Sequence, residues 1–104
     1  MKLFVTDPCL VVPDSQWSDF CDATDGDSLD KPFNIDGGGR VVDLQHTANG
    51  DGGCRVRGKE FGTDTGLIAI IEVADDFKPE HNVGAFAKEL NDAKELMAAV
   101  CAAL

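Results

Sequence analysis

Apolar residues fall along this chain in two kinds of spacing, short runs typical of β-strands and one long helical repeat. Strand-like runs lie at 3–5, 10–12, 40–45, 54–56 and 66–73, and residues that favour turns separate them. The run at 66–73 is apolar almost throughout, as expected for the most buried strand of a sheet. The pattern predicts a mainly antiparallel sheet of about four or five strands.

The segment 85–103 carries apolar residues at steps of four and three, the period of an amphipathic α-helix. The stripe consists of Phe86, Leu90, Ala93, Met97, Val100 and Leu104. A helix of this length is expected to lie across one face of the sheet. The same steps also form a heptad repeat, so the alternative is a seam for a second copy of the chain, which would give a homodimer through the C-terminal helix.

Turn-forming residues divide the rest of the chain. Pro8 separates the first two apolar runs and predicts one opening strand that bends or bulges there, at a sheet edge, because proline cannot donate to a ladder. The segment 24–39 is rich in Asp, Gly, Ser and Pro and is typical of a long surface loop. The turn signal at 49–53 predicts a hairpin between the strands 40–45 and 54–56.

A short helix is predicted directly after Pro13, with Asp14 or Ser15 as its capping residue. Three residues at steps of three and four define a face of this helix that should be buried. These are Trp17, Phe20 and Cys21. With 104 residues, 43% of them apolar, the chain is expected to form a single α+β domain over residues 1–104, with a short helix near its start and a long amphipathic helix at its end.

The chain is strongly acidic. Nineteen Asp and Glu residues against nine Lys and Arg give a formal net charge of −10, which disfavours direct binding to nucleic acid or to an anionic membrane and favours a host protein with a basic surface. No apolar run resembles a signal peptide or a membrane span. We therefore expect a cytoplasmic protein, in a host cell, whose four cysteines stay reduced.

The negative charge is concentrated at both ends of the sequence. Residues 1–36 hold eight carboxylates against two lysines, a net of −6, and residues 63–104 hold eight against three lysines, a net of −5. The densest group is the acidic cluster, which we define as Asp19, Asp22, Asp25, Asp27 and Asp30. Such a cluster is suited to a basic partner surface, where it would take the place of nucleic-acid phosphates. The alternative is a solvated acidic loop.

Metal binding is not expected of this cluster. A calcium loop requires glycine at its sixth position and glutamate at its twelfth, and counting from Asp22 these positions hold Asp27 and Phe33. Weak divalent binding is the alternative. The cysteines, Cys9, Cys21, Cys54 and Cys101, are widely spaced and match no zinc-ligand pattern even with His46, so we predict neither a metal nor another cofactor.

The middle of the chain, residues 37–62, is a basic island with a net charge of +1, from four cations against three carboxylates. Arg55, Arg57 and Lys59 are spaced by two, so in a strand they would share one face. That face could hold a small anionic, nucleotide-like ligand. The alternative is that neighbouring carboxylates balance these cations.

No catalytic motif is present. His46 and His81 are the only histidines, and neither lies in a recognisable arrangement with a nucleophile and an orienting group. The alternative is nucleophilic catalysis by Cys9 or Cys54 with His46, if folding brings the two side chains together. The sequence predicts a protein that is not an enzyme.

The segment 7–13, Asp-Pro-Cys-Leu-Val-Val-Pro, followed by Trp17 and Phe20, resembles the opening of a group of small bacteriophage and prophage proteins. In that group an Asp-Pro-Cys-Tyr-Val stretch precedes a short helix with an aromatic residue. The turn at 50–52 and the strand entry at 64–68 resemble further parts of the pattern.

This resemblance implies phage origin without carrying an activity. Small acidic phage proteins often bind and block host proteins, including CRISPR-like defence complexes whose grooves are lined with Lys and Arg. The resemblance and the charge together predict a non-catalytic, anti-CRISPR-like inhibitor that binds its host target through the acidic cluster. The alternatives are a binder of an anionic ligand at the basic island and a structural, oligomerising protein.

Overall fold

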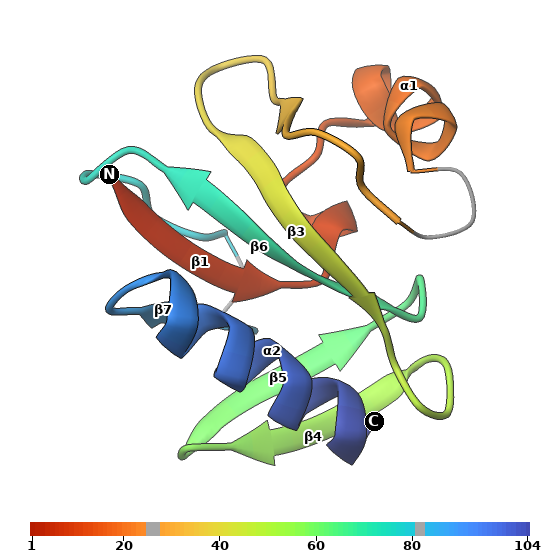
Figure 1. Cartoon of the computed structure of the whole chain (residues 1–104), viewed down its shortest axis with the longest axis vertical. Helices are drawn as coiled ribbons and strands as arrows, with labels where there is room; N and C mark the ends of the chain where they lie inside the picture. Colours follow the sequence, from red (N-terminus) through yellow and green to blue (C-terminus); the bar gives the residue numbers. More distant parts are fainter. Residues whose placement is uncertain (25–27, 81–82) are drawn as a thin grey trace.

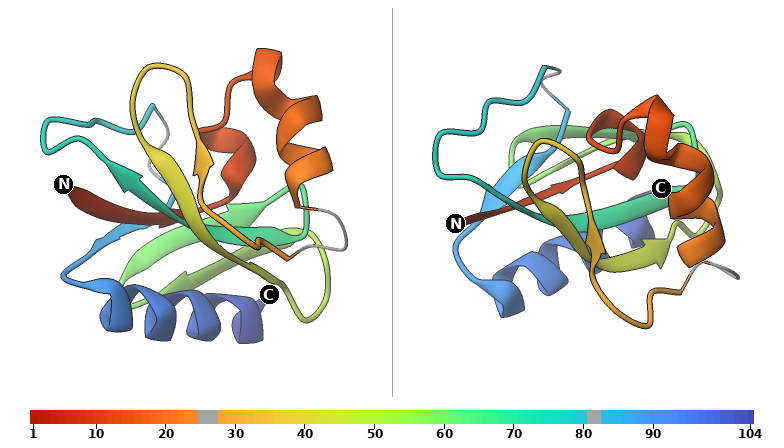
Figure 2. Two further views of the ribbon diagram at one scale, coloured as in Figure 1. Left: turned by 45° about the horizontal axis from the view of Figure 1, so that its top comes forward. Right: turned by 90° about the horizontal axis from the view of Figure 1, so that it is seen from above.

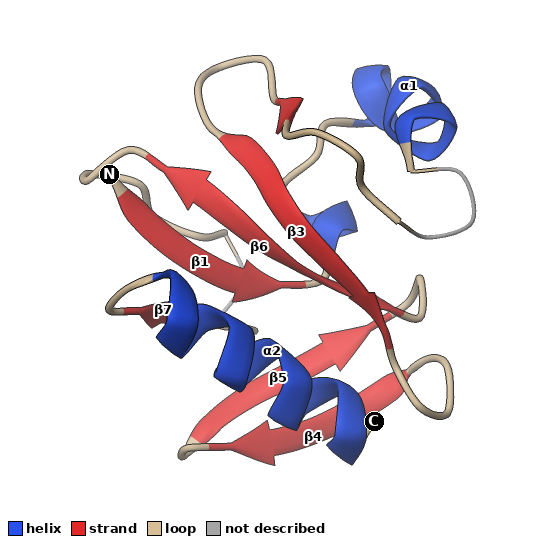
Figure 3. Ribbon diagram, in the orientation of Figure 1, coloured by secondary structure: helices blue, strands red, loops and turns tan. Residues whose placement is uncertain are grey.

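The computed structural model describes residues 1–24, 28–80 and 83–104. Its elements confirm an α+β fold (Figures 1 and 3). They are β1 (Lys2–Thr6), the 3₁₀ turn η1 (Pro8–Leu10), α1 (Asp14–Ala23), β2 (Phe33–Asn34), β3 (Arg40–His46), β4 (Gly52–Val56), β5 (Lys59–Thr63), β6 (Leu67–Val73), β7 (Ala85–Ala87) and α2 (Leu90–Ala103).

Five strands form one antiparallel sheet in the order β2-β3-β6-β1-β7, and β4 and β5 form a separate two-stranded sheet. The central strand is β6, as its apolar run predicts. It is covered on both faces, because Leu67, Ala69, Ile71 and Val73 point into one core and Ile68 and Ile70 into another. A strand buried on both faces cannot alternate apolar and polar residues, which accounts for its hydrophobic sequence, interrupted only by Glu72.

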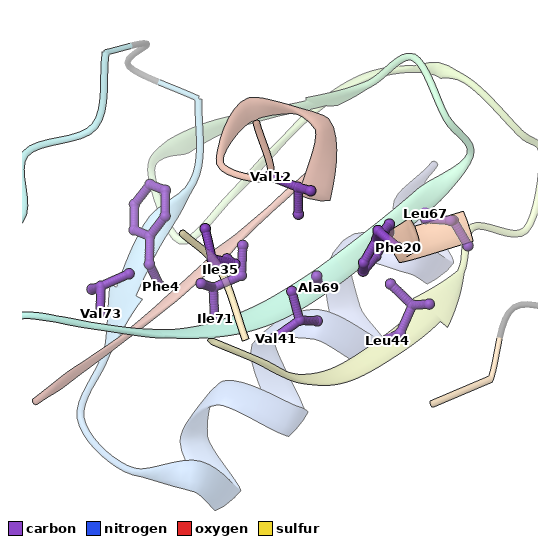
Figure 4. Close-up of a cluster of buried hydrophobic side chains, with 10 residues drawn as sticks. All are labelled: Phe4, Val12, Phe20, Ile35, Val41, Leu44, Leu67, Ala69, Ile71 and Val73. Atoms are coloured by element: carbon purple, nitrogen blue, oxygen red, sulfur yellow. The ribbon is translucent and has the colours of Figure 1, made fainter. Parts of the chain in front are cut away.

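The first core lies between the sheet and the segments around α1 (Figure 4). Phe20 of α1 is 1% exposed, and its ring packs against Trp17 at 5.2 Å and Phe33 at 5.3 Å between centroids. Val41 and Leu44 of β3 both reach this core although three positions separate them, because a bulge shifts the register of β3 against β6. A bulge changes which face the following residues occupy.

The second core lies on the opposite face, where α2 covers the five-stranded sheet and also contacts β4 (Figure 2). The buried residues of α2 are Ala93, Leu96, Met97, Val100 and Cys101. Phe61 of β5 joins them, so the two sheets and α2 share one core. The predicted packing of the helix on the sheet is confirmed, and most of the apolar stripe is buried within the chain itself.

The start of the C-terminal helix was predicted too early. Residues Ala85–Ala87 form β7, which pairs with β1, and the helix begins at Leu90. Phe86 therefore does not belong to the helical stripe; its ring lies 4.9 Å from that of Phe4 and remains 43% exposed. Pairing with β1 overrides the helical spacing of these residues.

The predicted bend at Pro8 and the predicted hairpin are also wrong. The strand ends at Thr6, and the segment around Pro8 forms η1, because the Asp7 side chain caps this turn by accepting from the Cys9 N–H at 3.0 Å. The strand β1 lies inside the sheet, between β6 and β7, and not at an edge. The strand β3 pairs with β2 and β6, whereas β4 pairs with β5.

The short helix is confirmed as α1, but two of its predicted details are wrong. Its capping residue is Pro13, without a side-chain cap, and Asp14 is the first helical residue. Cys21 is exposed, whereas Phe20 is buried. The Gln16 side chain fixes α1 to the segment after it, since its Nε2 donates to the Asn34 carbonyl and its Oε1 accepts from the Asp36 N–H. The predicted loop after α1 contains β2.

Candidate functional site

The acidic cluster begins on α1. Asp19 and Asp22 are exposed and lie three positions apart on this helix, so they are neighbours on its surface. Asp30 is exposed in the segment that leads to β2. Asp25 and Asp27 lie outside the described residues. The helix is held by the buried Phe20, so Asp19 and Asp22 lie on a supported element.

Asp19, Asp22 and Asp30 form no ion pair with the described cations. Arg40 contacts Glu72, and the N-terminal ammonium contacts Asp75, so two of the basic groups are occupied elsewhere. Exposed carboxylates that form no ion pair keep their charge available to a partner, which steers association with a basic surface. The described part of the cluster has the exposure that a docking surface requires.

The basic island is organised differently from its prediction. β4 ends at Val56, and Arg57 lies in the following turn with a left-handed φ of 53°. Arg55 contacts Glu60 at 2.6 Å, and Arg57 contacts Asp92 of α2 at 2.8 Å. The three cations therefore do not share one strand face, because the chain turns at the middle residue. Carboxylates balance both arginines, as the alternative interpretation expected.

A second feature joins two distant segments, 7–13 and 64–68. The side chain of Asp7 is 2% exposed, and four groups donate to it. Its Oδ1 accepts from the Cys9 N–H at 3.0 Å and the Thr65 hydroxyl at 2.9 Å, and its Oδ2 accepts from the Asp64 N–H at 2.8 Å and the Thr63 hydroxyl at 2.9 Å. We call this the Asp7 network. Its donors satisfy both oxygens, as burial of a carboxylate requires.

A pocket of about 260 Å³ lies beside the Asp7 network. Its wall comes from η1, from both strands of the small sheet, from the turn after β5 and from the segment before β7. The lining residues are Asp7, Leu10, Gly52, Gly62, Thr63, Asp64 and Val83. No local sequence pattern predicts this pocket. Its residues come from five places along the chain, and only the folding of the chain brings them together.

The thiols near these features are poor nucleophiles. Burial, followed by the hydrogen bond and negative charge of Asp7, raises the pKa of Cys9 to about 12. Burial, followed by the charge of Glu60, also raises the pKa of Cys54. The thiolate is the reactive form. His46 Nδ1 lies 3.3 Å from the Gly66 carbonyl oxygen, and among the described residues no three His, Cys, Asp or Glu side chains are arranged to hold a metal ion.

Comparisons with known proteins give no relative: no family model, no curated protein and no solved structure matches this chain. Within the described ranges, neither α1 nor α2 has the length and apolar character that a membrane crossing needs.

Proposed function

We propose that this chain is a non-catalytic, phage-type inhibitor that binds a basic, nucleic-acid-handling host protein, such as a CRISPR-like defence complex, through its acidic cluster. The observation that carries the proposal is the exposure of Asp19, Asp22 and Asp30, which form no ion pair with the cations on the described part of the chain. A net charge of −10 adds long-range attraction to the same kind of surface. The host cytoplasm is the compartment in which such a target is met.

The scaffold supports this function because it presents Asp19 and Asp22 on a fixed element, α1. Phe20 anchors α1 in the first core, and the Gln16 side chain ties the helix to the backbone at Asn34 and Asp36. A pre-organised surface loses less conformational entropy on binding than a mobile one. The cluster can therefore contribute affinity as well as a faster association rate.

The alternatives have less support. An anionic ligand at the basic island would have to compete with Glu60 for Arg55 and with Asp92 for Arg57. A homodimer through α2 would have to use the part of the apolar stripe that the sheet leaves open, where Leu90 is 46% exposed.

The test is a charge-reversal pair measured against one captured target. Immobilised wild-type chain is exposed to bacterial host lysate at low salt, and the retained complex is identified and purified. The variant Asp19→Lys/Asp22→Lys/Asp30→Lys is then compared with a control, Asp51→Lys/Asp76→Lys/Glu95→Lys. All six side chains are exposed, and three reversals in either variant add six units of charge to −10, so the two variants have the same net charge.

The cluster variant should lose binding by about tenfold or more, while the control keeps most of it, since only the cluster makes close contacts. Binding of the wild type should weaken with salt and compete with the nucleic acid of the target. Equal losses of affinity in the two variants would show that net charge alone causes the loss. Full binding by the cluster variant would show that α1 does not contact the target. Both results contradict the proposal.

A further inference from the structure

The pocket beside the Asp7 network is lined by two carboxylate residues and by aliphatic side chains. Asp7 is buried, whereas Asp64 is exposed. Leu10 and Val83 supply the aliphatic surface. Gly52 and Gly62 also line the space and have no side chains to fill it.

One lining position, Gly62, lacks a side chain. A Cβ placed on Gly62 would meet the Gly52 carbonyl oxygen at 3.4 Å and Val83 Cγ1 at 3.8 Å. Both of these residues line the pocket. A larger side chain at Gly62 would therefore begin beside two other lining residues and take up part of the space between them.

The hydrogen bonds around Asp7 suit a carboxylate that accepts at both oxygens. Each of its oxygens accepts from a backbone N–H, which can only donate, and from a threonine hydroxyl. Two of these four donors are backbone N–H groups, one to each oxygen. Neutral donors stabilise a negative charge on Asp7 without cancelling it.

No cation of the chain offsets this charge within the described residues. No lysine or arginine lines the pocket, and neither Asp7 nor Asp64 takes part in an ion pair. The same two carboxylates affect the pKa of Cys9: after burial, Asp7 and then Asp64 are the main causes that raise it. A partly enclosed site with negative charge and no counter-charge attracts a positive group.

The dimensions limit the ligand. About 260 Å³ is below the usual range for a drug-sized or nucleotide ligand, roughly 300–1,000 Å³. It suits a chain of a few methylene groups with one charged end. Leu10 and Val83 can contact such a stem, and the Asp64 carboxylate and the Gly52 carbonyl can accept from its N–H groups. The four donors around Asp7 fill its acceptor positions, so Asp7 acts on the ligand through its charge.

We propose that this pocket binds an aliphatic cation, a protonated alkylamine or alkylguanidine, held by Asp64 and the pocket backbone over the Asp7 charge. The same chemistry can come from a free amine or from a lysine or arginine side chain of a partner protein. The site is separate from the acidic cluster on α1 and does not rest on the function proposed above.

The experiment is a titration of ¹⁵N-labelled protein, followed by amide chemical shifts, with butylammonium, butylguanidinium and uncharged butanol. The two cations should shift the amides of Gly62, Thr63 and Asp64 with dissociation constants of about millimolar order, as expected for such small ligands, and butanol should not. A Gly-Lys-Gly peptide with blocked ends distinguishes the two sources: shifts at the same amides assign the site to a side chain, and shifts with the free amines alone assign it to a small molecule.

Two variants make the test specific. Asp64→Asn removes the charge of the Asp64 side chain but keeps the backbone N–H that donates to Asp7. It should weaken cation binding about tenfold. Asp76→Asn, an exposed carboxylate outside the pocket, is the matched control and should bind like the wild type. Gly62→Val should abolish binding by filling the pocket. Absence of cation-specific shifts in the wild type, or unchanged affinity in Asp64→Asn, would overturn the proposal.

Discussion

The carboxylate of Asp7 accepts a hydrogen bond from the Thr63 hydroxyl at 2.9 Å, across 56 positions of sequence. This bond connects the end of β1 to the end of β5, which belong to different sheets. The Thr63 hydroxyl also lies 3.1 Å from the Leu67 carbonyl oxygen and accepts from the Gly66 N–H at 3.1 Å. The Asp7 network therefore fixes how the small sheet sits against the large one.

Asp7→Asn should destabilise the fold. The amide would present an NH₂ donor towards one of two backbone N–H groups, so one buried donor would lose its acceptor. We expect the free energy of unfolding to fall by about 2–3 kcal/mol, measured by urea denaturation. The control Asp76→Asn, at an exposed position, should change it by less than about 0.5 kcal/mol. Similar small effects in both variants would show that the network does not hold the two sheets together.

The packing of α2 can be tested with two leucines on the same helix. Leu96 is 1% exposed, whereas Leu90 is 46% exposed. Leu96→Ala should lower the free energy of unfolding by about 2–5 kcal/mol, because it leaves a cavity in the second core. Leu90→Ala should cost less than about 1 kcal/mol. Denaturation of both variants measures these free energies, and light scattering measures their molecular mass. A mass change caused by Leu90→Ala would instead indicate that this end of α2 contacts a second copy.

Two glycines with positive φ differ in their surroundings. Gly84 has a φ of 130°, and a Cβ there would lie 2.7 Å from the Val5 carbonyl oxygen, whereas Gly58 has a φ of 73° and open space around it. Gly58→Ala should cost about 1–2 kcal/mol from backbone conformation alone. Gly84→Ala should cost clearly more, on the order of 3 kcal/mol, since β1 must also move. Thermal denaturation of both variants measures the difference, and equal costs would mean that the contact with β1 is unimportant.

Much of the fold could be predicted from local patterns. The apolar run of β6 reflects burial on both faces, and the helical spacing after Leu90 reflects burial of one face of α2. The errors arose where the choice of pairing partner decides. The segment 85–87 fits a helix by its spacing but pairs with the distant β1. The strand β3 pairs with the distant β6, and β4 pairs instead with β5 across the short turn at Arg57 and Gly58.

The candidate sites were predictable to different degrees. Charge density alone predicted that Asp19, Asp22 and Asp30 would be exposed, as they are. Asp residues near a turn-rich segment usually are. The ion pair between Arg57 and Asp92 has no local signal, since it joins a turn to a helix far along the sequence. The buried role of Asp7 was hidden for the same reason. One signal was present: Thr63 and Thr65 place hydroxyl donors on both sides of Asp64.

The Cys9 thiol should make the fold sensitive to alkaline pH. Its pKa is raised from 9.0 to about 12, first by burial and then by Asp7. In the unfolded chain the thiol loses its proton near pH 9, whereas in the folded chain it keeps the proton until about pH 12. The unfolded state is therefore favoured increasingly across this window, so the stabilisation is complete below pH 9 and lost towards pH 12.

Urea denaturation of the wild type and of Cys9→Ala at pH 8 and pH 10.5 measures this effect. The chain has no tyrosine, so phenol ionisation does not contribute to the change. The wild type should lose more of its free energy of unfolding than Cys9→Ala between the two pH values. Cys21→Ala, which removes an exposed thiol on α1, should lose as much as the wild type because Cys9 remains. Equal losses in wild type and Cys9→Ala would show that Cys9 does not hold its proton more tightly in the folded chain. Burial and the charges of Asp7 and Asp64 would then not raise the pKa of this thiol.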